Sequence, residues 1–171
     1  MARFSLSGWI TEEAKELLFE ASAASHPLET GGIVAGVLVE GRPWITHVKE
    51  IPSQVSGHSS YMLPAGKTSP AVAALRASDP RVGYLGDWHS HPANVGASSL
   101  DLRTLRRSSQ DNDAHAPLLV VVRRDKLGSY ALDVHAWARI RSRRVHLADS
   151  GPLPRNSIDG SQRRSRSRSR G

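Results

Sequence analysis

Residues 89–101 constrain this chain more than any other stretch, because they place two histidines directly after an apolar run. Residues 82–88 are typical of a β-strand, and we expect this strand to carry His89 and His91 at its end. Side chains two positions apart on an extended strand point to the same side. Both imidazole rings are therefore expected to face one point beside the sheet.

A serine and an aspartate follow the histidines at a helical spacing. Ser98-x-x-Asp101 is typical of an N-cap and first turn, and it predicts a helix over residues 99–109, after a loop over residues 92–97. Two imidazole nitrogens and one carboxylate oxygen, with a fourth position open, are the ligand set of a catalytic zinc site. We therefore predict that the two histidines and Asp101 bind a metal ion.

The motif is similar to that of a known family. His89-Ser90-His91-Pro92 followed by Ser98-x-x-Asp101 resembles the JAMM motif of the MPN/JAB metallopeptidases, here with six residues between the second histidine and the serine where seven are usual. The segment from Glu29 to Gly36, Glu-Thr-Gly-Gly-Ile-Val-Ala-Gly, resembles the part of bacterial members that carries an upstream glutamate. The resemblance covers residues 10–138.

This resemblance implies a zinc-dependent peptidase or isopeptidase with one Zn²⁺ per chain. Its substrate would be an amide or isopeptide bond after the C-terminal tail of a ubiquitin-like or sulfur-carrier-type protein, cleaved by a zinc-activated water. Glu29 would be the general base, and Ser98 would donate a hydrogen bond to the oxyanion. Residues 83–92 further resemble JAB peptidases of bacterial operons that carry conjugation-like enzymes, including antiphage systems.

Each residue also has a simpler explanation. Ser98 and Asp101 are sufficient as a helix cap, Glu29 as a loop ion-pair partner, and a lone histidine is usually structural or at the surface. The joint pattern favours the metal site. A non-catalytic MPN scaffold is the main alternative, although all five motif residues are present. Asp87 fits either a partner that orients a ligand histidine or a solvated carboxylate.

Composition limits the other classes of function. The 171 residues contain no cysteine, which excludes disulfides, thiolate metal sites and a cysteine nucleophile. We find neither a signal peptide nor an apolar run long enough to cross a membrane, so we expect a soluble cytoplasmic protein.

The positive charge is concentrated at the C-terminus. Of the net charge of +7, residues 155–171 contribute +5, from six arginines and one aspartate, which leaves +2 for the rest. We therefore expect a metallopeptidase-like domain over residues 1–148 and a disordered Arg/Ser-rich tail over residues 149–171. The tail is either a solvated extension or a weak nucleic-acid-binding segment, the second alternative for function.

The remaining elements predict an α+β fold. Hydrophobic periodicity predicts a first helix over residues 11–24 and further elements in the order β-β-α-β-α-β-β. Residues 139–147 fit either an edge strand or a helix. The family resemblance implies a three-layer arrangement in which helices flank a central mixed sheet, and the order of elements agrees. Glycines 31, 32 and 36 precede or lie in a strand and are expected to allow close backbone approach near Glu29.

Overall fold

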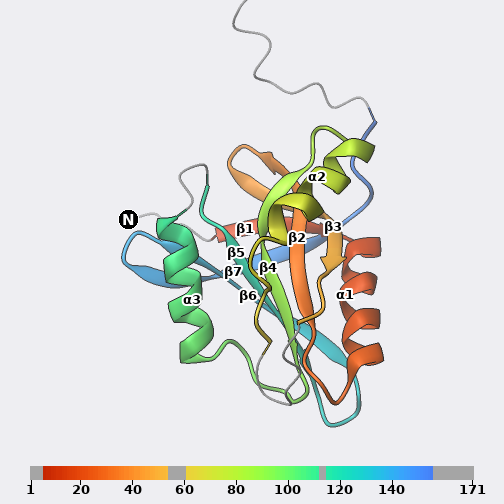
Figure 1. Ribbon diagram of the computed structural model, residues 1–171, viewed down its shortest axis with the longest axis vertical. Helices are drawn as coiled ribbons and strands as arrows, with labels where there is room; N and C mark the ends of the chain where they lie inside the picture. Colours follow the sequence, from red (N-terminus) through yellow and green to blue (C-terminus); the bar gives the residue numbers. More distant parts are fainter. Residues whose placement is uncertain (1–5, 54–60, 112–114, 156–171) are drawn as a thin grey trace, which may run out of the picture.

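The computed structural model describes residues 6–53, 61–111 and 115–155. Within these ranges it contains seven strands and three helices, and their arrangement is drawn in Figure 1. In chain order they are β1 (Leu6–Thr11), α1 (Glu12–Ser25), β2 (Gly31–Val39), β3 (Arg42–Glu50), α2 (Thr68–Ser78), β4 (Gly83–His91), α3 (Ser99–Gln110), β5 (Leu118–Arg124), β6 (Tyr130–Ala138) and β7 (Arg141–Ser150).

The strands form one mixed sheet that closes on itself. Their order is β1-β3-β2-β4-β5-β6-β7, and a parallel pairing of β1 with β7 joins the two ends. The β2–β3 and β6–β7 hairpins are antiparallel, whereas β4 pairs with β5 in parallel through a connection that contains α3. The α+β class and the mixed sheet are as predicted; its closure into a barrel was not.

Two apolar clusters show where the core lies. The larger cluster fills the barrel and includes two residues of α1, Ala14 and Leu18, both fully buried. The smaller cluster lies between the sheet and α3, where Leu105 packs on Leu119 and Val121 of β5. Helices α1 and α3 lie at opposite sides of the molecule, which gives the expected layers of helix, sheet and helix (Figure 1).

The first helix begins where its sequence predicts. Thr11 is the N-cap, and its Oγ1 accepts a hydrogen bond from the backbone N–H of Ala14 at 3.2 Å. Glu12 and Glu13 lie in the first turn, where their negative charge is favoured by the helix dipole. The cap also joins β1 to α1 directly, so the helix packs back against the strand that precedes it.

One strand was missed, and a segment for which strand and helix had both been open is a strand. β1 was missed because its six residues alternate weakly, and it is recognised only by its pairing with β3 and β7 on either side. The open segment 139–147 forms most of β7, which continues to Ser150, two residues beyond the expected domain boundary at 148. Residues 156–171, which hold most of the expected tail, lie outside the described part of the chain.

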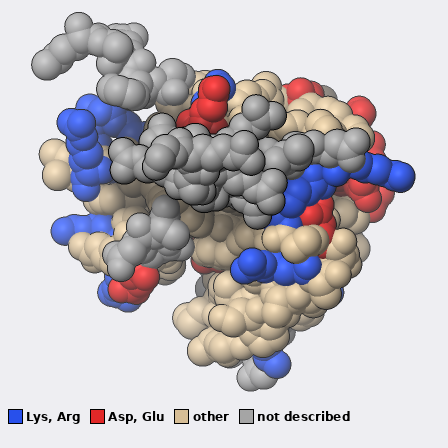
Figure 2. Space-filling model, turned by 90° about the horizontal axis from the view of Figure 1, so that it is seen from above, with Lys and Arg blue, Asp and Glu red and all other residues tan. Residues whose placement is uncertain are grey.

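The surface and the helices agree with the composition. Seen from above, the folded part exposes both basic and acidic side chains, in keeping with its small net charge (Figure 2). None of the helices in the described ranges is long and apolar enough to span a membrane.

Adjacent leucines of α1 allow the packing to be tested. We expect Leu18→Ala to lower the free energy of unfolding by about 2–5 kcal/mol, because it opens a cavity in the barrel core. Leu17 is 42% exposed, so Leu17→Ala should change the free energy of unfolding by no more than about 0.5 kcal/mol. Urea denaturation followed by circular dichroism measures both. An equal loss of unfolding free energy in the two variants would contradict this description of the core.

Candidate metal centre

The register of β4 against β5 directs the two histidines toward α3. His89 pairs with Val121 and His91 with Arg123, so the histidines share a sheet face with Val121. That face is the one covered by α3, since Val121 packs against Leu105. Trp88 and Ser90, on either side of His89, lie on the opposite face, and Trp88 is fully buried in the barrel core.

The three predicted ligands converge on one point. The ligand atoms of His89, His91 and Asp101 all lie within 4.8 Å of one another, and the part of the chain that the structure describes contains no other such group of three His, Cys, Asp or Glu residues. The two Nε2 atoms are 3.0 Å apart, and the Asp101 oxygens lie 3.3 Å from Nε2 of His89 and 3.7 Å from Nε2 of His91.

These distances fit a metal ion. Tetrahedral ligands bound at 2.0–2.2 Å are separated by about 3.3–3.6 Å, close to the spacing of the three donor atoms.

A hydrogen bond to the loop orients the ring of His91. Its Nδ1 lies 2.8 Å from the carbonyl oxygen of Val95. A carbonyl only accepts, so Nδ1 is the donor in this contact, and Nε2 is the ring nitrogen that faces the centre.

Asp101 reaches the same point from the first turn of α3. Its Oδ2 accepts the backbone N–H of Ser98 at 2.6 Å, and Ser98 Oγ accepts the backbone N–H of Asp101 at 3.1 Å, which completes a capping box. Burial raises the pKa of Asp101, but the hydrogen bonds from His89 and Ser98 outweigh it and hold the pKa below the ordinary value. The carboxylate is therefore charged at neutral pH, as a metal ligand must be.

Glu29 lies just before β2, in the part of the chain that runs beside the histidines. Gly31 pairs with His89, and the backbone N–H of Ser90 donates to the Thr30 carbonyl at 2.8 Å. Extending this antiparallel register two residues beyond the Gly31–His89 pair would bring Glu29 opposite His91. The Glu29 Oε2 accepts the backbone N–H of Tyr61 at 2.8 Å.

Tyr61 was missed by the sequence analysis. Its ring stacks on His89 with centroids 6.5 Å apart, and its hydroxyl donates to the carbonyl of Ile51 at 2.6 Å. A Cβ on Gly31 would lie 2.6 Å from the Tyr61 ring, so the glycine permits the close approach that was expected near Glu29. The only feature of the sequence that could have pointed to Tyr61 was that it is a single aromatic residue in a polar segment.

Asp87 hydrogen-bonds to a tyrosine. Its Oδ1 accepts the hydroxyl of Tyr84 at 2.9 Å. Burial raises the pKa of Asp87, an effect that the Tyr84 hydrogen bond and the charge of His89 reduce. The carboxylate is therefore partly buried rather than freely solvated.

Comparison with known proteins identifies the family. The model for prokaryotic homologues of the JAB domain matches residues 11–140, a range that contains every residue of the candidate centre. The chain belongs to the prokaryotic JAB family. It is therefore a metallopeptidase of this family by descent, with a His-His-Asp candidate metal site.

Two curated relatives and one solved structure agree with this assignment. The chain is 27% identical to the CD-NTase/cGAS isopeptidase of Pseudomonas aeruginosa, over 71% of this chain and 87% of the relative. It is 30% identical to "Probable metalloprotease y4qB" of Sinorhizobium fredii, over 67% of this chain and 73% of the relative. A solved protein of Desulfitobacterium hafniense shares the fold, with a TM-score of 0.62 and 14% identity over 84% of this chain and 93% of that one.

The capping box predicts a graded effect at Ser98. Ser98→Ala removes the acceptor for the Asp101 N–H and should lower the free energy of unfolding of the metal-free protein by about 1 kcal/mol. Ser98→Gly should lower the free energy of unfolding by only a few tenths of a kcal/mol, since glycine is tolerated at N-caps. Urea denaturation in the presence of a chelator measures both. A glycine variant less stable than the alanine variant would argue against the cap.

Proposed function

We propose that this protein is a zinc-dependent isopeptidase that hydrolyses an amide or isopeptide bond at the centre formed by His89, His91 and Asp101. The observation that carries the proposal is the convergence of these three side chains within 4.8 Å, in a chain of the JAB family. Zinc is favoured because two imidazoles and one carboxylate at tetrahedral spacing are its usual protein ligands in hydrolases. When bound, zinc supplies a Lewis acid that polarises the scissile carbonyl and lowers the pKa of a water ligand to about 7.

Glu29 is assigned the role of general base. Its carboxylate takes a proton from the attacking water and passes it to the nitrogen of the leaving amine. Support comes from the strand register, which would place Glu29 opposite His91 if it were extended, and from the Tyr61 N–H, which orients the carboxylate through Oε2. We assign the proton to Oε1. Tyr61 also contacts His89, so one residue orients both the base and a ligand.

Ser98 is assigned the role of oxyanion donor. Its Oγ accepts the Asp101 N–H as part of the cap, so the hydroxyl hydrogen remains for donation to the substrate. A single donor of this kind is worth about 10²–10³ in rate. The N-terminus of α3 adds a favourable dipole at the same point.

The substrate we propose is a protein joined through the C-terminal tail of a ubiquitin-like or sulfur-carrier-type protein. The relative named "CD-NTase/cGAS isopeptidase" supports this class, because an isopeptidase cleaves an isopeptide bond. A flexible tail also suits a site at a strand end, where an extended chain can reach the three ligands.

The zinc proposal predicts the metal content of two histidine variants. The purified protein should hold about one zinc per chain, and His91→Ala should lose it, because two remaining ligands bind too weakly. His146 is exposed on β7 and outside the candidate centre, so His146→Ala is the matched control and should retain the zinc. Elemental mass spectrometry measures all three, and a folded parent protein without zinc after reconstitution would favour the scaffold alternative.

The base assignment predicts a separation of binding from hydrolysis. Glu29→Gln should retain zinc and lose hydrolysis of a ubiquitin-like C-terminal fusion by at least about 10²-fold, since the amide does not accept the proton. Glu20 is exposed on α1, and Glu20→Gln should leave the rate unchanged. Full activity of Glu29→Gln would remove Glu29 from this role.

A further inference from the structure

The loop over residues 92–97 supports two of the three candidate ligands. The carbonyl of Val95 accepts from the His91 ring, and Ala97 directly precedes the Ser98 cap that holds Asp101. Any displacement of this loop would therefore move an imidazole and a carboxylate together. How the loop is held in place decides the geometry of the centre.

The loop is attached to two strands beyond β4. The backbone N–H of Arg124 on β5 donates to the carbonyl of Ala93 at 3.3 Å. On β6, Asp133 Oδ2 accepts the backbone N–H of Ala97 at 2.9 Å, across 36 residues of sequence. This second contact lies one residue before Ser98, the N-cap of the helix that carries Asp101.

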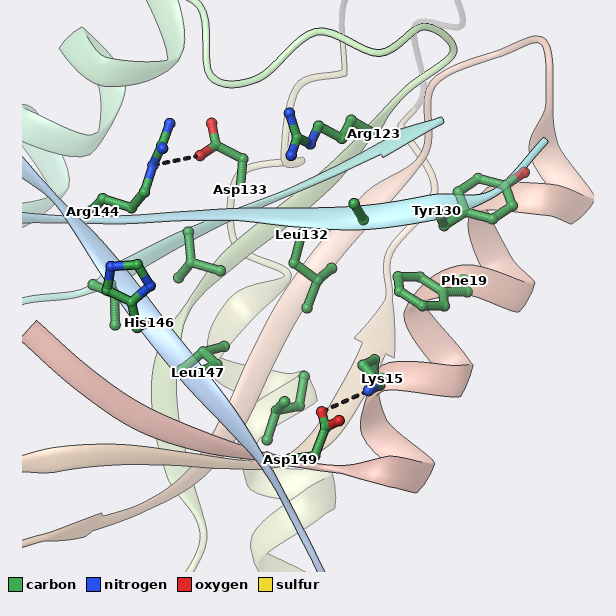
Figure 3. A pocket seen from close by; sticks show the side chains of 14 residues that line it. Lys15, Phe19, Arg123, Tyr130, Leu132, Asp133, Arg144, His146, Leu147 and Asp149 are labelled. Carbon is green, nitrogen blue, oxygen red and sulfur yellow. Dashed lines mark hydrogen bonds and ion pairs between the residues drawn. The ribbon is translucent and has the colours of Figure 1, made fainter. Parts of the chain in front are cut away.

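Asp133 is itself held rigidly. It is 7% exposed, and its Oδ2 also accepts from Nε2 of His135 at 2.9 Å. Its Oδ1 lies 3.3 Å from Nε of Arg144. In Figure 3 the carboxylate lies between the side chains of Arg144 and Arg123, and the dashed line marks the ion pair with Arg144. A buried carboxylate with three donors has little freedom to move.

Gly96 gives independent evidence of the same contact. A Cβ at this position would lie 2.4 Å from Asp133 Oδ2 and 3.2 Å from the carboxyl carbon. The carboxylate cannot move aside without giving up its three partners. The loop thus reaches Asp133 so closely that only glycine fits.

We propose that Asp133 is a positioning residue of the metal centre, which sets the loop that orients His91 and Asp101 through its hydrogen bond to the Ala97 amide. The inference rests on the proposed metal centre, but it makes a separate statement about the metal-free loop. It does not require that Asp133 contact the metal or the substrate.

Two substitutions at Asp133 separate the loop contact from the charge. Asp133→Leu has similar size and no acceptor, so zinc affinity should fall about 10- to 100-fold, as is usual when a residue supporting metal ligands is lost. Asp133→Asn keeps an oxygen for Ala97 and His135, and the 68% exposed Arg144 side chain can turn to solvent. The asparagine variant should therefore retain zinc affinity within a few fold. Competition with a chromophoric chelator measures each affinity.

A third variant perturbs the contact from the loop side. Gly96→Ala should weaken zinc binding by a similar factor, because the added methyl pushes the loop from Asp133. Two matched controls lie elsewhere. Asp79 is a partly buried carboxylate paired with Arg81, and a Cβ on Gly83 would meet nothing within 4 Å. Asp79→Asn and Gly83→Ala should both bind zinc as the parent protein does.

Hydrogen–deuterium exchange of the metal-free protein completes the test. In Asp133→Leu, peptides covering residues 92–101 should exchange faster than in the parent protein and in the two controls. Unchanged exchange would overturn the loop contact, whether or not the protein binds zinc. The positioning role would be overturned if exchange were faster in Asp133→Leu while its zinc affinity stayed unchanged. It would also be overturned if Asp133→Leu and Asp133→Asn lost zinc affinity equally. A parent protein that binds no zinc would defeat the proposed function, while exchange still decides the loop contact.

Discussion

β4 lies beside β5 in parallel register, and this pairing decides which way the two histidines point. β5 is buried on both faces, with Val120 in the barrel core and Val121 under α3. A shift of one residue would exchange these faces, so the register is firmly set. This register also sets the direction of the histidine side chains, because His89 is paired with Val121. The geometry of the candidate metal centre is thus a consequence of how an apolar strand is buried.

The polar groups around the centre are supported by neighbours from distant parts of the chain. Ser90, behind the histidines, exchanges hydrogen bonds with Thr30, and Asp133 receives the amide of Ala97. Buried polar groups without partners destabilise a fold, so these contacts permit a charged site beside the core. Because several of the partners are backbone groups, the site depends on the position of whole segments as well as on side chains.

Local patterns were enough to predict which three side chains would converge on the candidate site. The spacing of His89 and His91 on a strand and the Ser98-x-x-Asp101 cap act within a few residues, and the observed elements follow these spacings. Contacts across long sequence separations could not be predicted in this way. β1 is defined by two strands far along the chain, and Asp133 by an amide 36 residues away. The acidic residue within the apolar alternation of β6 indicated a special role for Asp133, but no nearby residue indicated which group it would contact.

The helix cap and the candidate metal site use the same carboxylate, and this removes the apparent choice between a structural and a chemical role for Asp101. Oδ2 is engaged by the Ser98 amide, and Oδ1 lies 3.3 Å from His89 Nε2. The cap therefore fixes the rotation of the carboxylate and leaves one oxygen directed at the centre. The same hydrogen bonds, aided by the positive end of α3, keep the group ionised despite its partial burial. A ligand held charged and oriented by its own helix loses less entropy when a metal binds, so the capping explanation supports the metal-binding one.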